Sequence, residues 1–203
     1  MKSMTLSHIA VALCLTVGVA AHAQTMSKDE YKAAKEKIEA NYKSADKACD
    51  SMAGNAKKVC VAEAKGFEKT SLADLESNYK PSAKTRRDAA DAKADANYSI
   101  ASQRCQDQAG NAKDVCIKEA KSAETAAKAD AKVQLKTAEA QTDAKKTSGD
   151  ASTKATEKVL EARSEASVDK ANAQYKVEKE KCDALAGAAK DDCLAQAKSK
   201  FGK

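Results

Sequence analysis

The 203-residue sequence has no tryptophan, one proline and two histidines, and aromatic residues make up 3% of it. Both histidines, His8 and His22, lie in an N-terminal segment that we predict to be removed. Without histidine, the remaining chain cannot build a Ser-His-Asp or Cys-His catalytic arrangement or the usual zinc site. It also has no Cys-x-x-Cys pair and no glycine-rich phosphate loop. We therefore expect no enzyme, no cofactor and no metal site.

The segment predicted to be removed is residues 1–23. A positive start at Lys2 precedes an apolar run over residues 9–21, and Ala21-His22-Ala23 forms an A-x-A cleavage site, as in secretory signal peptides. An uncleaved membrane anchor is the alternative, but such a helix needs about 20 apolar residues. Lipidation of Cys14 is disfavoured because Leu13 precedes it where a small residue is required. Cleavage after Ala23 places the protein in the periplasm.

Large apolar residues are scarce in the predicted mature chain. From Gln24 to Lys203, 40 positions are alanine, whereas leucine, isoleucine, valine and phenylalanine together occupy 18. Alanine, lysine, glutamate and glutamine favour helices. With Lys2 lost, 35 basic and 30 acidic residues give a net charge of +5. The composition predicts long helices that meet along thin alanine seams, with little large apolar surface to bury.

Six cysteines remain, arranged as three Cys-x10-Cys pairs, and the surroundings of the pairs repeat. Each copy has a tyrosine seven residues before the first cysteine, a glycine five residues after it, and two lysines that follow the glycine by three and eleven residues. The cysteines are Cys49, Cys60, Cys105, Cys116, Cys182 and Cys193; the turn glycines are Gly54, Gly110 and Gly187.

The spacing within a copy predicts a helical hairpin closed by its own disulfide. In one continuous helix the two cysteines would be about 16 Å apart along the axis, whereas a disulfide requires Cα atoms within about 7 Å. The chain must therefore reverse between them, and the midway glycine suits a helix C-terminus, with Asn55 or Asn111 capping the next helix. The alternative is a continuous helix with both cysteines on one face, free or bonded to another chain.

These units predict an all-α fold of long antiparallel helices forming three disulfide-stapled hairpins, either a coiled-coil-like bundle or an extended rod. We expect helices at 27–53, 56–79, 82–108, 112–147, 151–185 and 188–201. The hairpin repeats would span residues 24–80, 81–148 and 149–203, with Pro81 marking the first boundary.

Two sets of repeated side chains are candidates for function. The lysines after each turn form a candidate anion-binding set, although solubility and charge pairing on exposed faces are the favoured explanation. The repeated tyrosines are expected to pack near the disulfides. The lysines are Lys57, Lys65, Lys113, Lys121, Lys190 and Lys198.

Alanine-, lysine- and acid-rich stretches such as residues 89–96 and 123–132 resemble the helical region of the cell-envelope protein TolA. The resemblance implies an envelope-spanning or spacer role. This chain departs from that family because it has no retained anchor, no recognisable C-terminal globular domain and three cysteine units.

Three functions fit these features. The first is a structural or interaction protein of the cell envelope, acting on a protein partner. The second is a binding module for an anionic envelope polymer, and the third is a holdase-like stress protein, which the scarce apolar surface disfavours. Nucleic acid is not an expected partner, because the charge is nearly balanced and aromatic platforms are lacking.

Overall fold

The computed structural model describes residues 26–146 and 149–203, with side chains undescribed at residues 146 and 149–152. The described residues form six α-helices, with no β-strand among them. The predicted signal peptide lies outside them. The helices are α1 (Lys28–Ala48), α2 (Gly54–Tyr79), α3 (Ala83–Arg104), α4 (Gly110–Lys146), α5 (Gly149–Cys182) and α6 (Gly187–Phe201).

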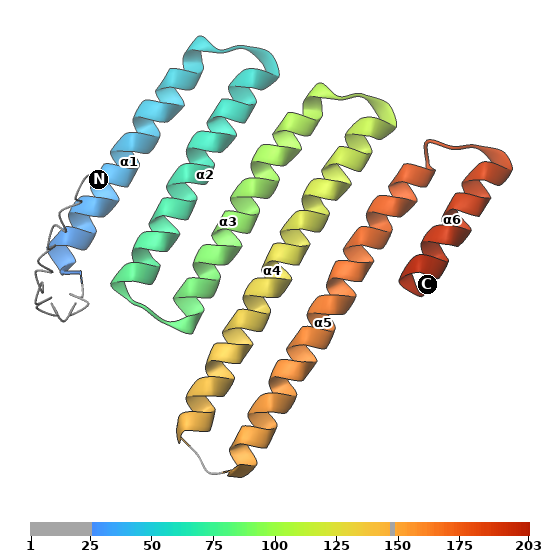
Figure 1. The fold of residues 1–203 in the computed structure, drawn as a ribbon. Helices are drawn as coiled ribbons and strands as arrows, with labels where there is room; N and C mark the ends of the chain where they lie inside the picture. Colours follow the sequence, from blue (N-terminus) through green and yellow to red (C-terminus); the bar gives the residue numbers. More distant parts are fainter. Residues whose placement is uncertain (1–25, 147–148) are drawn as a thin grey trace, which may run out of the picture.

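The helices lie side by side in one layer and alternate in direction (Figure 1). The extensive contacts join consecutive helices, α1 to α2 and so on to α6. The all-α fold with three disulfide-closed hairpins is therefore confirmed. The hairpins are arranged as a flat array, which is neither of the two predicted arrangements, a compact bundle or an extended rod. Such an array leaves two broad faces, and each interior helix packs along two narrow sides.

Alanine forms the seams between helices. Twelve of the 17 buried apolar residues in the described part are alanine, three are cysteine, and Leu75 and Val177 complete the set. Gly66 on α2 also lies in a seam, where a Cβ atom would be 3.3 Å from the Ala96 Cβ of α3. Small side chains let neighbouring helices approach closely, which explains how a chain with so few large apolar residues packs at all.

The helices end earlier at the hairpin tips than we predicted. The first ends at Ala48 and the third at Arg104, and each continues as a short 3₁₀ turn, Cys49–Ser51 and Cys105–Asp107. The 3₁₀ turns tighten the chain before it reverses. At the opposite end, Ser82 caps α3 in a reciprocal pair of hydrogen bonds with Thr85, and this junction follows Pro81.

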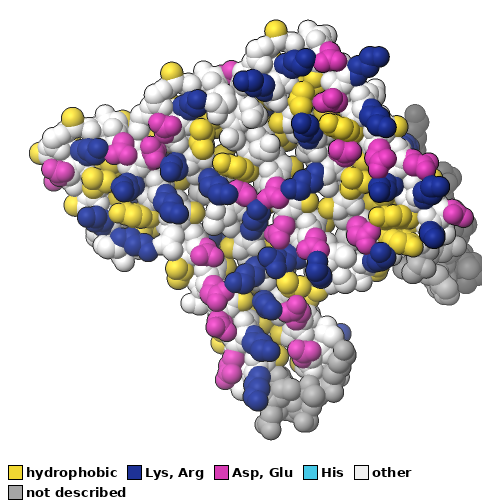
Figure 2. Space-filling view, turned by 180° about the vertical axis from the view of Figure 1, so that it is seen from behind, with side chains coloured by type: hydrophobic (Ala, Val, Ile, Leu, Met, Phe, Trp, Pro, Cys, Tyr) yellow, Lys and Arg dark blue, Asp and Glu magenta, His cyan; other side chains and the backbone are white. Residues whose placement is uncertain are grey.

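The α4–α5 pair extends beyond its neighbours. Beyond its cysteine, α4 continues from Cys116 to Lys146, whereas α2 continues from Cys60 only to Tyr79. The difference is three additional turns, which correspond to about 16 Å of helix. We call this extension the arm, residues 136–146 and 149–159; it forms the projection at the bottom of Figures 1 and 2. In the described part of the chain, no helix is long and apolar enough to cross a membrane.

Candidate functional site: hairpin tips and hairpin junctions

Each hairpin tip is closed by its own disulfide. The bonds join Cys49 to Cys60, Cys105 to Cys116 and Cys182 to Cys193, with Cα atoms 5.6, 5.7 and 5.7 Å apart. The first cysteine of each pair is at most 1% exposed. The predicted pairing within each repeat is confirmed. The three bonds also indicate an oxidising, extracytoplasmic compartment.

The tip glycines open the second helix of each hairpin. Gly54, Gly110 and Gly187 have φ values of +59°, +56° and +58°, in the left-handed region that only glycine adopts without strain. They are the first residues of α2, α4 and α6, so they do not form the C-terminal cap of the preceding helix. The chain reverses over the residues just before them.

In two of the three tips, the lysine three residues after the glycine forms an ion pair across the turn. Lys57 pairs with Asp50 and Lys190 with Asp183, both at 2.9 Å. The Lys190 ammonium, which hydrogen-bonds Asp183, lowers the pKa of that carboxyl. In the middle tip the acidic position is Gln106, and no ion pair of Lys113 is found among the described residues.

The second lysine of each copy differs between copies. Lys121 pairs with Glu124 at 2.6 Å and lies 4.9 Å from the ring centroid of Tyr98. Lys65 and Lys198 are exposed and make no ion pair with any described residue. Because the three hairpins point the same way in one layer (Figure 1), equivalent lysines lie on the same broad face. Of the six candidate lysines, Lys57, Lys121 and Lys190 form ion pairs. Lys65, Lys113 and Lys198 form none with the described residues.

The repeated tyrosines have different surroundings. Tyr98 lies under Lys121, and Tyr175 meets Phe201 of α6 edge-on at 6.2 Å. Tyr42 is half-buried. All three lie one heptad before a buried cysteine, on the side of the helix that faces its hairpin partner. Their positions favour packing over ligand binding.

An unpredicted contact joins each hairpin to the next. Asn55 donates its side-chain amide to the Gln103 carbonyl at 2.7 Å, and Asn111 donates to the Glu180 carbonyl at 2.8 Å. Both acceptors lie two residues before the first cysteine of the following hairpin. The predicted capping role of the asparagines is wrong: no side chain caps α2, and Asn55 Oδ1 is buried without a hydrogen-bond partner in the described structure.

An ion pair recurs beside each asparagine contact. Glu63 meets Arg104 at 2.6 Å, and Glu119 meets Lys181 at 3.2 Å. The glutamates follow the second cysteine of a hairpin by three residues, and the basic residues precede the first cysteine of the next by one. We call the asparagine bond and the ion pair together the junction contacts. The two junctions of the array thus use the same bonds at equivalent positions.

The two edges of the array carry different residues at these positions. Where the outer side of α6 would need the asparagine and the glutamate, it has Ala188 and Gln196. Where α1 would need the basic residue it has Ala48. These three positions lack the groups that join hairpins internally, as expected of terminal repeats with no further hairpin to join. The presence of asparagine in copies one and two but not three was a sequence signal for the junctions.

We expect the junction asparagines to contribute measurably to stability. Replacing Asn55 or Asn111 by alanine removes a half-buried donor and its hydrogen bond to the next hairpin, which should cost about 1 kcal/mol each. Replacing Ala188 by serine at the open edge is the matched control and should cost less. Urea denaturation followed by circular dichroism measures the difference. Equal effects at all three positions would contradict the role assigned to the asparagines.

A chain of ion pairs crosses the centre of the layer. Asp95 on α3 accepts from Lys69 on α2 at 2.6 Å and pairs with Lys128 on α4. Lys128 also pairs with Glu124 at 2.7 Å, and this glutamate is 6% exposed. The Lys128 and Lys69 ammonium groups lower the pKa of Asp95 to about 2, while Asp95 and Glu124 raise the pKa of Lys128. The chain links three consecutive helices from two hairpins.

The lowered pKa of Asp95 predicts acid sensitivity. The free carboxyl of an aspartate titrates near pH 3.9, so stabilisation by ionised Asp95 is complete above that pH and is lost as pH falls toward 2. We expect the melting temperature to fall less steeply between pH 4 and pH 2 in Asp95→Asn than in the parent. Thermal melts at half-unit pH steps measure this. Parallel curves would show that Asp95 is not part of the acid response.

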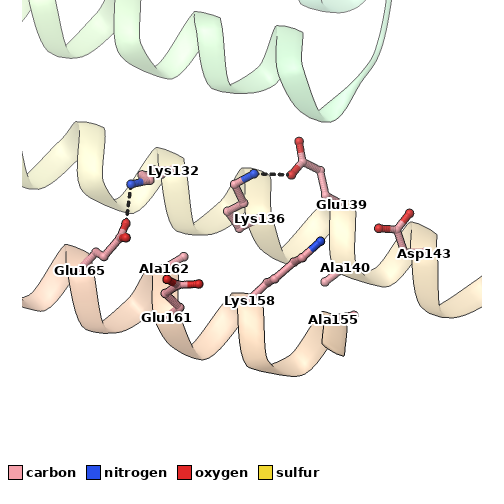
Figure 3. A pocket seen from close by; sticks show the side chains of 10 residues that line it. All are labelled: Lys132, Lys136, Glu139, Ala140, Asp143, Ala155, Lys158, Glu161, Ala162 and Glu165. Atoms are coloured by element: carbon pink, nitrogen blue, oxygen red, sulfur yellow. Dashed lines mark hydrogen bonds and ion pairs between the residues drawn. The ribbon is translucent and has the colours of Figure 1, made fainter. Parts of the chain in front are cut away.

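A shallow groove runs along one side of the arm and the adjoining turns (Figure 3). Alanines from α4 and α5 form its floor, and lysines and carboxylates alternate along its rims. Lys132 pairs with Glu165 at 2.5 Å and Lys136 with Glu139 at 2.9 Å. The charges are mixed in sign, so the groove does not select a cation or an anion. Sequence reasoning did not point to it.

The described residues hold no group of three or more histidine, cysteine, aspartate or glutamate side chains that could bind a metal ion. The face drawn in Figure 2 carries basic and acidic side chains in close alternation.

Comparisons with known proteins give no relative: no protein-family model, no curated protein and no solved structure matches this chain.

Proposed function

We propose that this chain is a non-enzymatic interaction protein of the cell envelope, exported to the periplasm by a signal peptide cleaved after Ala23. The observation that carries the proposal is the single-layer array: consecutive hairpins join at their narrow sides, so both broad faces are open to a partner (Figure 1). Repeat arrays of this kind use such extended surfaces for binding. The proposed spacer role from the TolA resemblance is compatible with it.

A face-specific photo-crosslinking experiment tests this proposal. Lys65 and Phe67 are both exposed and are two residues apart on α2, so they point about 200° apart toward opposite faces. A photoreactive amino acid at each position would be irradiated in intact periplasm. We expect one discrete protein adduct from one position and not the other. If positions 65 and 67 gave adducts in equal yield and over the same broad range of masses, the proposal that one face binds a specific protein would be contradicted.

The second candidate is binding of an anionic envelope polymer, which is favoured by the three candidate lysines that make no ion pair with any described residue, Lys65, Lys113 and Lys198. Replacing Lys65, Lys113 and Lys198 by glutamine should then abolish salt-sensitive retention on immobilised lipopolysaccharide or peptidoglycan. Lys57→Gln with Lys190→Gln is the matched control, because these lysines already pair with aspartates. Equal loss in both variants, or retention unchanged by salt, would argue against this candidate.

The holdase alternative has less support. Five large apolar side chains are exposed in the described part, and they are dispersed over the hairpins. They are Met52, Phe67, Leu160, Val168 and Leu185. A client-binding protein needs a contiguous apolar surface.

A further inference from the structure

A second groove lies between α2 and α3, beside the junction of the first two hairpins, and has a volume of about 440 Å³. Its lining combines the apolar side chains of Val61 and Ala62 with three lysines of α2, Lys57, Lys58 and Lys65. No acidic side chain is among the described residues that line it. We call it the junction groove, and its charge is of one sign, unlike that of the groove along the arm.

Two of the three lysines have no partner within the described structure. Lys57 pairs with Asp50 at 2.9 Å, whereas Lys58 and Lys65 are exposed and make no ion pair with any described residue. Lys58 and Lys65 are seven residues apart, so they lie on the same side of α2, about 10 Å apart along the helix axis. The junction groove therefore presents two unpaired positive charges, two helical turns apart, beside an apolar surface.

The second junction differs at the equivalent positions. Lys118 replaces Ala62 and pairs with Glu180 of α5 at 3.8 Å, so an ion pair spans the two helices there. Asp114 replaces Lys58. Both junctions nevertheless make the same junction contacts, so the unpaired lysines of the first are not needed to join hairpins. They are free to recognise a partner.

Resting on the proposed protein partner, we propose that the junction groove binds an acidic helix of that partner, with two carboxylates seven residues apart that pair with Lys58 and Lys65. A helix aligned with α2 has the same rise per residue, so its side chains at this separation recur on one side at the same spacing of about 10 Å. An extended chain fits less well, because its side chains recur on one side at about 7 and 14 Å. Small apolar residues between the carboxylates would contact Val61 and Ala62.

A designed peptide tests this on the mature, oxidised chain. The probe is a fluorescent alanine- and glutamine-based helix with two glutamates seven residues apart. In its control peptide the glutamates are nine residues apart and therefore point to opposite sides. Fluorescence anisotropy at low salt should show tighter binding of the probe than of the control. A probe that does not bind, or binds no better than its control, would overturn the inference.

Charge variants of the protein locate the bound peptide. Lys58→Gln with Lys65→Gln should raise the dissociation constant of the probe about tenfold, because both ion pairs are lost. Lys113→Gln with Lys118→Gln removes the same charge at the second junction and should leave it unchanged. Lys58→Glu with Lys65→Glu should bind the probe sequence that carries lysines in place of glutamates. Equal losses at the two junctions, or no rescue by the lysine peptide, would contradict binding in the junction groove; circular dichroism verifies that each variant is folded.

Photo-crosslinking from the α3 rim identifies the natural occupant. Ser99 is exposed and lines the junction groove, and a photoreactive amino acid there would be irradiated in intact periplasm. Mass spectrometry should place the crosslink in a partner segment with acidic residues seven apart, and Lys58→Gln with Lys65→Gln should abolish the adduct. A discrete protein adduct at position 67 with none at 99, or an adduct with lipopolysaccharide, would overturn the acidic helix alone. Absence of any discrete protein adduct at positions 65, 67 and 99 would contradict the proposed protein partner as well.

Discussion

Removing the third disulfide should release α6 from the array. In Cys182→Ala/Cys193→Ala, a helix of 15 residues that buries only Ala197 among its described residues is held by one seam alone. Isolated helices of that length are marginal in water, and a disulfide that closes a loop of this size contributes about 2–3 kcal/mol. Hydrogen exchange should show the α6 amides losing protection while α3 and α4 keep theirs.

The middle disulfide provides the comparison for this experiment. In Cys105→Ala/Cys116→Ala, α3 still packs against α2, and α4 still packs against α5. The amides of both helices should therefore stay protected at 25 °C, although the melting temperature falls. If α6 remained protected in the first variant, or if the middle variant lost as much structure, position in the array would not determine the effect of a disulfide.

A bulky side chain at Gly66 should separate the first hairpin from the second. A Cβ atom there would be 3.3 Å from both the Ala96 Cβ and the Ile100 Cδ1. The further carbons of leucine therefore have no space unless α2 and α3 move apart. We expect Gly66→Leu to lower the free energy of unfolding by about 1–3 kcal/mol, the usual cost of overpacking. Urea denaturation measures it.

Two further variants distinguish crowding from a change in helix propensity. Gly66→Ala gains up to about 1 kcal/mol of helix propensity against one tight contact, so its stability should stay within about 1 kcal/mol of the parent. Combining Gly66→Leu with Ile100→Ala removes one of the two obstructing side chains and should recover part of the loss. A leucine variant as stable as the alanine variant would contradict close packing at this seam.

The sequence predicted the hairpins because one geometric requirement decided them. The two cysteines of a Cys-x10-Cys pair can bond only if the chain reverses, and the glycine midway located the reversal, so the helices and disulfides followed. The predicted helix ends were several residues too long at the tips, because the 3₁₀ turns at Cys49 and Cys105 depend on how the disulfide draws the two helices together. Local propensity at these residues does not encode that constraint.

The arrangement of the hairpins and the junction contacts depended on longer-range information. Alanine seams carry little directional preference, so periodicity alone did not distinguish a bundle, a rod or a layer. Asn55 was assigned to the nearest helix end because asparagine commonly caps helices, whereas its acceptor is the carbonyl of Gln103, 48 residues away. Among the candidate lysines, Lys57 and Lys190 pair with aspartates at the tips. The middle copy has Gln106 in place of that aspartate. The sequence repeat indicated that the asparagine and lysine positions matter, but only the structure showed which residues they contact.

The equivalence of the two junctions has an evolutionary consequence. Recombination between misaligned repeats in the gene could delete or duplicate an internal hairpin, and the new junction would still place an asparagine opposite a carbonyl and a glutamate opposite a base. The outermost residues, Ala48 on one side and Ala188 on the other, would be inherited unchanged. Array length could therefore vary between descendants in steps of one hairpin, with the junction contacts at each tip retained.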